Sequence, residues 1–221
     1  MISFDNAASV IGIPSGGHVT FSFTCAPGAY LFVSGNQNIT SVTCNGVSMS
    51  ILLNVTSPFI DGNQQTVKVF GFATPVSGSN SIDVSTTSDT SIFLASYTGV
   101  DKNTVPVSVS YSFPNNGMNN TQVTGLAESL ISPSDGAWTV YFNTNSRGTV
   151  TMTASQGTLR AANTADTRIQ GGAIVDSNGP VNGGVNSTLQ ADLSSGTAFM
   201  GAAIFSLAAA IDDSIPQMTI I

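Results

Sequence analysis

The stretch His18-Val-Thr-Phe-Ser-Phe-Thr24 decides the fold class. Polar and apolar residues alternate along it, so Val19, Phe21 and Phe23 share one face of an extended chain. A period of two is typical of a β-strand that buries one face and exposes the other to water. This stretch therefore predicts a strand of a half-buried antiparallel sheet.

Short runs rich in valine, isoleucine, threonine and aromatic residues recur along the rest of the chain, separated by turns rich in glycine, asparagine and proline. Many short strands at such spacing are typical of a sandwich or barrel. We expect an all-β protein, folded as a jelly-roll-like antiparallel β-sandwich. The further expected strands span residues 66–73, 81–85, 91–98, 107–113, 137–142, 149–153, 168–175, 185–193 and 197–207.

A hairpin is predicted where Asn45-Gly46 separates the runs 39–44 and 47–53. Asparagine followed by glycine favours a type I′ turn, because both central residues need positive φ. Helical signals are weak. We expect at most one helical turn over residues 126–131 and a short alanine-rich helix over 206–211.

Charge is scarce: 8% of the residues are charged, and the formal net charge is −7. The five basic residues lie far apart, so they form no patch that could neutralise a run of phosphates. We therefore expect neither nucleic acid nor an anionic membrane surface as a partner. The basic residues are Lys68, Lys102, Arg147, Arg160 and Arg168.

Targeting segments are not expected. The start, Met-Ile-Ser-Phe-Asp, lacks the positive and apolar regions of a secretory signal. The most apolar window, residues 197–211, is about 15 residues long, shorter than the roughly 20 that span a bilayer. A buried strand followed by a short helix explains this window better than a membrane anchor.

Catalytic residue types are few. His18 is the only histidine and sits at a strand entry, so we expect a structural role. A serine hydrolase would need it as the base, and no Gly-x-Ser-x-Gly elbow is present. Glu128 is the only glutamate, whereas glycosidases pair two carboxylates. The adjacent Asp212 and Asp213 are interpreted as a solvated cap, and we expect that the protein is not an enzyme.

Two loops hold closely spaced carboxylates and amides, Asp61-Gly-Asn63 and Asp176-Ser-Asn178-Gly179. Such loops suit calcium, but Asx-turns explain both equally well. Neither matches the full calcium-loop pattern, so no metal and no cofactor is assigned to any residue.

Cysteine and aromatic residues favour a core. Cys25 and Cys44 are interpreted as buried thiols, with a disulfide between adjacent strands as the alternative. Trp138 alternates with Val140 and Phe142, which favours a core position. The four tyrosines, Tyr30, Tyr97, Tyr111 and Tyr141, lie in strand runs and are expected to be at least half buried.

Three segments together resemble a family of jelly-roll-like β-sandwich modules found in phage and prophage structural proteins and in some secreted bacterial proteins. They are Thr40-Ser-Val-Thr-Cys-Asn45-Gly46-Val47, Pro75-Val-Ser-Gly78-Ser-Asn80-Ser-Ile82-Asp-Val84 and Ala95-Ser-Tyr97-Thr-Gly99-Val100-Asp101. The family then has Thr-Pro, where this chain has Thr104-Val105-Pro106, one residue longer. The resemblance covers about residues 40–207 and implies a sandwich fold more strongly than a function.

The expected function is that of a non-enzymatic virion structural protein of a bacteriophage, chiefly a capsid decoration (cement) protein on the particle surface. The alternative is a receptor- or glycan-binding module of a tail fibre, spike or adhesin. Its partners would be other virion proteins, such as the major capsid protein or tail and spike proteins. A homo-oligomer, for example a trimer, is also expected.

One domain is expected over residues 1–221, because a division near residues 114–121 would leave the first half with too few closing strands. Recurring Ser-Gly-Thr strand entries are interpreted as turn chemistry rather than as an internal repeat. Residues 1–17 are expected to form an N-terminal arm and residues 208–221 a tail that docks on neighbouring subunits. Deleting Pro216–Ile221 would then abolish assembly and leave the isolated fold intact.

Overall fold

The computed structural model describes residues 1–13, 16–36, 38–57, 65–114, 121–147, 150–163 and 170–210. Within these ranges the chain forms antiparallel strands joined by turns, with no helix long enough to be named. The expected all-β sandwich is confirmed. Of the predicted tail over residues 208–221, residues 211–221 lie outside the described residues, and Ala209 forms a β-bridge with Val100.

The first half of the chain forms one sandwich of two sheets. Its inner sheet has the strand order β1-β9-β3-β7-β6, and its outer sheet has the order β2-β8-β4-β5. The strands are β1 (Ser3–Ile13), β2 (His18–Cys25), β3 (Tyr30–Gly35), β4 (Ile39–Cys44), β5 (Val47–Ser48), β6 (Ser50–Thr56), β7 (Thr66–Phe72), β8 (Gly78–Thr86) and β9 (Thr90–Thr98).

The second half forms another sandwich. Its inner sheet has the order β10-β17-β12-β15-β14, and its outer sheet has the order β11-β16-β13. The strands are β10 (Ser108–Ser112), β11 (Gly125–Ile131), β12 (Trp138–Asn145), β13 (Met152–Gln156), β14 (Thr158–Ala162), β15 (Gly171–Asp176), β16 (Asn186–Leu193) and β17 (Met200–Leu207).

The two sandwiches share one topology. Counted in chain order within each sandwich, the first strand of the inner sheet (β1 or β10) pairs with the last strand (β9 or β17). That last strand also pairs with the third strand (β3 or β12), and two further strands complete the sheet. In each outer sheet the second strand pairs with the penultimate strand, and the fourth lies beyond it. This is the double Greek-key order of a jelly roll. The chain is therefore a tandem of two jelly-roll sandwiches.

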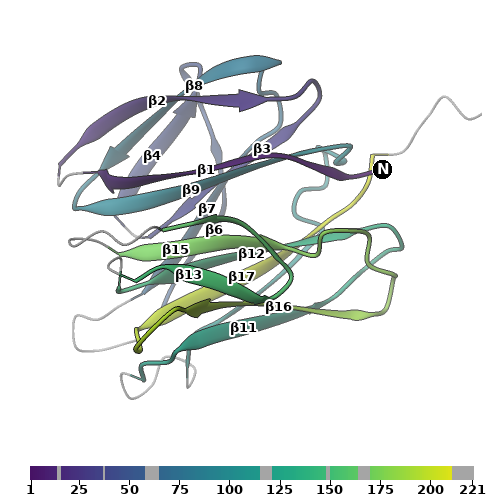
Figure 1. Cartoon of the computed structure of the whole chain (residues 1–221). Coiled ribbons are helices and arrows are strands. Elements are labelled where there is room, and N and C mark those ends of the chain that lie inside the picture. The colour runs from purple at the N-terminus through teal and green to yellow at the C-terminus, as the bar shows by residue number, and fades with distance from the viewer. Residues whose placement is uncertain are drawn as a thin grey trace, which may run out of the picture.

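The sandwiches are stacked in four layers (Figure 1). The outer sheet with β2, β8 and β4 lies at the top, the two inner sheets follow, and β16 and β11 lie at the bottom. Across the junction β9 packs against β15, and β7 packs against β17. Because these pairs are equivalent, the junction resembles an interface between two-fold related copies.

Strand patterning explains the layers, since an inner sheet must bury both of its faces. Along β3, Leu31 and Val33 enter the core of the first sandwich, while Phe32 enters the core between the inner sheets. Phe32 meets Phe142 and Phe205 there, with ring centroids 5.6 and 6.4 Å away. Because both faces of an inner strand such as β3 are buried, its sequence is a near-continuous apolar run.

The predicted hairpin at Asn45-Gly46 is confirmed. Asn45 has a φ of 52° and Gly46 a φ of 78°, as a type I′ turn requires. The turn joins β4 to β5, with Cys44 opposite Val47.

The two expected helices are not present in the described residues. Residues 125–131 form strand β11, which pairs with β16. Ser206 and Leu207 belong to β17, and Ala209 bridges Val100. Sheet pairing and burial of alternate side chains outweigh a weak local preference for helix.

The expected N-terminal arm over residues 1–17 is instead strand β1 over Ser3–Ile13, an edge strand of the first inner sheet. Ile2 and Ile13 are almost fully buried, so core packing holds this segment in place. A single sandwich was also expected, whereas the described residues form two. Whether the two behave as one folding domain stays a prediction.

The two sandwiches share only a few sequence features at equivalent positions. Gly28-Ala29 directly precedes β3, which begins at Tyr30, and Gly136-Ala137 directly precedes β12, which begins at Trp138. Gly28 and Gly136 both have a φ of 74°. Tyr30 pairs with the last strand of its sandwich at Tyr97, as Trp138 does at Leu207.

Candidate functional site

A buried ion pair lies at the junction of the two sandwiches. The Nε atom of Arg160 in β14 is 2.7 Å from Oδ2 of Asp176 in β15, and the Asp176 side chain is fully buried. The hydroxyl of Tyr97, from β9 of the other sandwich, donates to the same carboxylate at 3.1 Å. The Asn178 side chain accepts from the same guanidinium. The network therefore joins the two halves of the chain.

The surroundings of this ion pair are apolar. The Arg160 guanidinium lies over the Phe4 ring of β1, 4.1 Å from its centroid, which is a cation–π contact. Burial, followed by the charge of Asp176, raises the pKa of Tyr97 well above its usual range, so Tyr97 stays a neutral donor. All these groups are engaged with one another. The arrangement suits a structural role rather than ligand binding.

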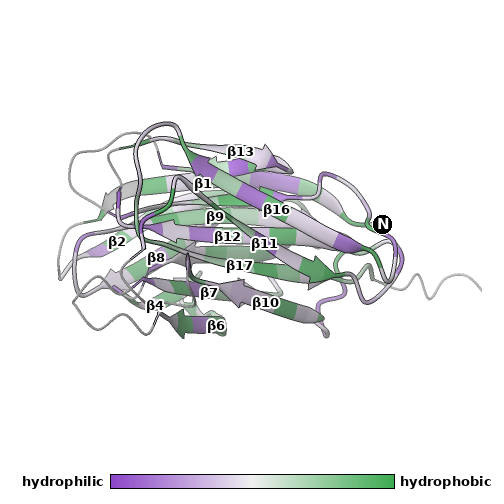
Figure 2. Cartoon of the chain, turned by 90° about the horizontal axis from the view of Figure 1, so that it is seen from below, coloured by the Kyte–Doolittle hydropathy of each residue, from purple (hydrophilic) through white to green (hydrophobic). Residues whose placement is uncertain are grey.

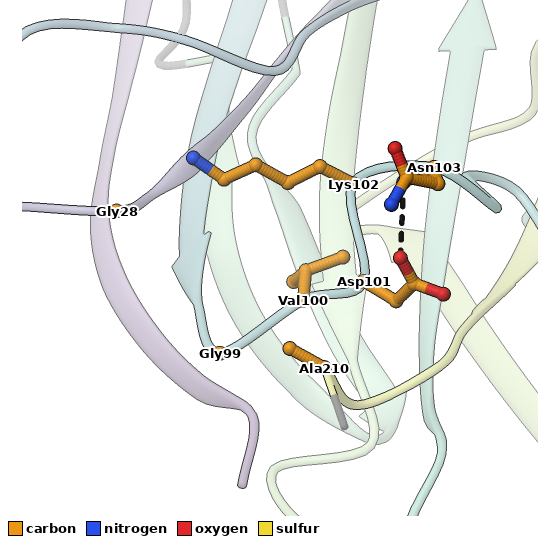
Figure 3. A pocket seen from close by; sticks show the side chains of 7 residues that line it. All are labelled: Gly28, Gly99, Val100, Asp101, Lys102, Asn103 and Ala210. Carbon is orange, nitrogen blue, oxygen red and sulfur yellow. Dashed lines mark hydrogen bonds between the residues drawn. The ribbon is translucent and has the colours of Figure 1, made fainter. Parts of the chain in front are cut away.

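A hollow of about 450 Å³ lies beside the linker from β9 to β10 (Figure 3). Its walls come from the turn before β3, the linker itself and the end of the described chain. The lining residues are Gly28, Gly99, Val100, Asp101, Lys102, Asn103 and Ala210.

Backbone contacts fix the shape of this hollow. Gly99 has a φ of 69°, and a Cβ there would lie 2.0 Å from the Met1 carbonyl oxygen, so only glycine fits. The Asp101 carboxylate accepts from the Asn103 backbone N–H at 3.0 Å and from the Thr104 hydroxyl at 2.9 Å. Asp101 therefore shapes the turn with both of its oxygens.

Lys102 is the cation of the hollow, and Figure 3 shows its side chain extending toward Gly28. The basic residues elsewhere in the described chain are engaged: Lys68 donates to the Ile39 carbonyl, and Arg147 donates to the Thr197 carbonyl. A single ammonium suits one carboxylate or another small anion. The lining contains no histidine, cysteine or hydroxyl side chain, and its one carboxylate, Asp101, is engaged within the turn.

An exposed apolar surface follows the linker. Val107, Val109 and Tyr111 are 39%, 40% and 52% exposed, and we call these three side chains the β10 face. The alternating residues, Ser108, Ser110 and Ser112, point the other way, toward the second outer sheet. The pairing of Val109 with Phe205 places the β10 face on the side of the core between the inner sheets.

His18 and Glu128, the two residues that the sequence analysis weighed and set aside as catalytic groups, lie apart from these features. His18 begins β2, and its Nε2 atom is 2.7 Å from the Asp83 carboxylate on β8. Glu128 on β11 is nearly buried and accepts a 2.5 Å hydrogen bond from Ser110. The two residues lie in different sandwiches, so the fold does not bring them together.

The loop at Asp176 is an Asx-turn closed by an ion pair. The backbone N–H of Asn178 donates to Asp176 Oδ1 at 2.9 Å, and Arg160 takes the other oxygen. This carboxylate is not available to calcium. The loop Asp61-Gly-Asn63 lies outside the described residues. Within the described ranges, no cluster of three or more histidine, cysteine or acidic side chains suits a metal ion.

The core predictions hold with one exception. Trp138 is 7% exposed, and Tyr30, Tyr97 and Tyr141 are buried, whereas Tyr111 is half exposed on β10. The prediction that all four tyrosines are at least half buried is therefore wrong for Tyr111. It failed because alternation along a strand does not show which face a neighbouring sheet covers.

Both cysteines are free, buried thiols, so the disulfide alternative is wrong. Cys25 in β2 and Cys44 in β4 lie on opposite sides of β8, which separates their strands. Burial raises the pKa of Cys25 to about 11 and also raises the pKa of Cys44. Neither is a reactive thiolate at neutral pH.

Sequence reasoning missed the Arg160–Asp176 pair and the exposure of the β10 face. Both depend on which strands of the two sandwiches meet, and no local pattern encodes that.

Comparison with known proteins gives no matching family model and no curated protein of significant sequence similarity. In the described part of the chain, no helix has the length and apolar character to cross a membrane.

Proposed function

We propose that this chain is a non-enzymatic structural protein on the surface of a bacteriophage particle, in the role of a capsid decoration protein. The observation that carries the proposal is the tandem of two jelly-roll sandwiches. Jelly rolls recur in viral capsid proteins, although they also occur in lectins and cupins. This support is an analogy at the level of the fold, which hosts several functions.

The character of the surface agrees with this role. The outward face of the first outer sheet exposes hydroxyl groups, as at Thr20, Ser22 and Thr24 on β2. Uncharged polar surfaces of this kind suit many weak, water-mediated contacts with a large neighbour. The acidic balance of the whole chain supports solubility when copies are crowded together.

The engagement of titratable groups supports the non-enzymatic part of the proposal. Asp5 accepts from the Ala26 backbone N–H and from the Ser96 hydroxyl, each within 2.8 Å. Glu128 accepts a hydrogen bond from the Ser110 hydroxyl, and Asp176 accepts one from the Arg160 guanidinium. Each of these carboxylates therefore holds strands or loops together.

The test is immunogold electron microscopy of particles from the producing culture, with antibody raised against the purified chain. We expect label spread over an icosahedral shell, and preimmune serum serves as the control. Label confined to a tail tip or vertex would replace decoration by host attachment, and glycan-array binding would follow. Unlabelled particles beside labelled cells or medium would overturn the virion role.

A further inference from the structure

The two inner sheets offer an internal comparison of how an edge strand is covered. Strand β1 is the first strand of one inner sheet, and β10 is the first strand of the other. The strands at the opposite edges of those sheets are β6 and β14, respectively. If the junction were fully symmetric, β14 would cover β1 and β6 would cover β10.

Only the first of these contacts is made in full. Strand β14 lies against β1, where Arg160 stacks on Phe4 and where Phe4 and Ala7 are partly buried against the central core. Strands β6 and β10 do not approach one another as closely. The equivalent side chains of β10, namely the β10 face of Val107, Val109 and Tyr111, are left exposed.

The β10 face is continuous with the apolar core between the inner sheets. Val109 pairs across the strands with Phe205, and Val105, just before Val107, packs against the same core. Figure 2 shows β10 at one margin of the molecule, beside β17 and on the same side as β6. The inter-sandwich interface thus runs out to the surface at this point.

The edge lacks the devices that usually protect an exposed strand. Residues 105–113, Val-Pro-Val-Ser-Val-Ser-Tyr-Ser-Phe, contain no charged side chain, and the two nearby prolines, Pro106 and Pro114, flank the strand but do not lie within it. Edge strands are normally guarded by charges, prolines or bulges within the strand. An unguarded apolar edge in a protein of low charge indicates that another surface covers it.

We propose that the β10 face is the contact through which a second copy of this chain binds. In the first sandwich, the surface that covers the equivalent face is a sandwich of the same fold, and a second copy supplies that fold again. The face is uncharged, so two copies that each carry a net charge of −7 meet there without opposing like charges. This inference goes beyond the proposed function, because it concerns the purified protein whatever particle carries it.

The test is analytical ultracentrifugation of the whole chain and of the double variant Val109→Lys/Tyr111→Lys, from about 1 to 100 μM. We expect the unchanged chain to self-associate and the variant to sediment as a monomer. Lysine ammonium groups cannot be desolvated in an apolar contact without a large loss. The dissociation constant should rise by about 30-fold or more, as for a central interface residue.

Two further variants keep the test interpretable. Val47→Lys, at a 57% exposed position on β5 of the first outer sheet, is the matched control and should leave association unchanged. Tyr111→Ser removes apolar contact without adding charge and should weaken association to a smaller extent. Circular dichroism melts confirm that each variant is folded.

Two results would overturn the inference. The unchanged chain could be monomeric up to 100 μM. The partner that covers the β10 face would then be the C-terminal segment of the same chain or a different protein, and not a second copy. Alternatively, the double variant could associate as strongly as the unchanged chain, which would place the contact elsewhere. Immunogold labelling does not depend on either result, so failure of this inference and failure of the virion role are distinguishable.

Discussion

At the scale of single residues, the most consequential group is the Arg160–Asp176 pair with Tyr97. A fully buried carboxylate is costly unless a cation and hydrogen-bond donors compensate it. Here one oxygen accepts from both Arg160 and Tyr97, and the other accepts from a backbone N–H. Because Tyr97 comes from the other sandwich, the network also fixes how the sandwiches are oriented.

Replacement of Arg160 should therefore be strongly destabilising. Arg160→Ala leaves the Asp176 carboxylate buried without a cation, and we expect a loss of roughly 3–5 kcal/mol in the free energy of unfolding. Urea denaturation followed by tryptophan fluorescence measures the loss. The matched control is Arg147→Ala, which removes an exposed side chain that donates to one carbonyl and should cost within about 0.5 kcal/mol.

The double variant Arg160→Met/Asp176→Leu separates the two contributions. It removes both charges together, so it should be less destabilising than Arg160→Ala alone. If the single and double variants lose equal stability, packing of the arginine stem matters rather than its charge.

At the scale of elements, turn geometry was encoded locally. The hairpin between β4 and β5 depends on Asn45 and Gly46, whose positive φ angles define the turn. The edge strands β1 and β10 show the opposite case. Both have alternating side chains, but only the neighbouring sandwich decides that Phe4 is covered and Tyr111 is not.

The hairpin yields a prediction that isolates backbone strain. Gly46→Ala should lower the free energy of unfolding by about 1 kcal/mol, because alanine disfavours a φ of 78°. A Cβ at Gly46 would meet nothing within 4 Å, so no steric clash contributes. Gly179→Ala is the control, since that site is equally open and its φ is not positive. Equal effects of the two variants would contradict the strain argument.

At the scale of the whole molecule, two sandwiches are joined by a shared core. Phe32, Phe142 and Phe205 pack in that core, and the first comes from one half while the others come from the second half. An isolated half would expose this apolar surface to water. The shared core therefore couples the stability of the two halves.

We expect residues 1–210 to unfold in a single cooperative transition. Differential scanning calorimetry should give equal calorimetric and van't Hoff enthalpies. Phe32→Ala should lower the free energy of unfolding by roughly 3–5 kcal/mol, and the protein should still unfold in one transition. Leu31→Ala, whose side chain faces the first outer sheet, is the comparison and should also shift a single transition. Two resolved transitions would show that the sandwiches fold independently.

The sequence by itself determined the features that depend on neighbouring residues. Alternation around His18–Thr24 gave the strands, Asn45-Gly46 gave the hairpin, and the core position of Trp138 followed from its alternation with Val140 and Phe142. A period of two and a turn dipeptide act over a few residues, so they are visible without the fold.

Only the tertiary structure decided the features that join distant segments. The strand over Ser3–Ile13, the strand over Gly125–Ile131, the duplicated topology and the buried Asp176 all depend on partners far away in the chain. The exposure of the β10 face depends on the sandwich that does not cover it. Strand pairing and sheet stacking are long-range choices made by burial of apolar surface, and local sequence patterns do not record which surfaces meet.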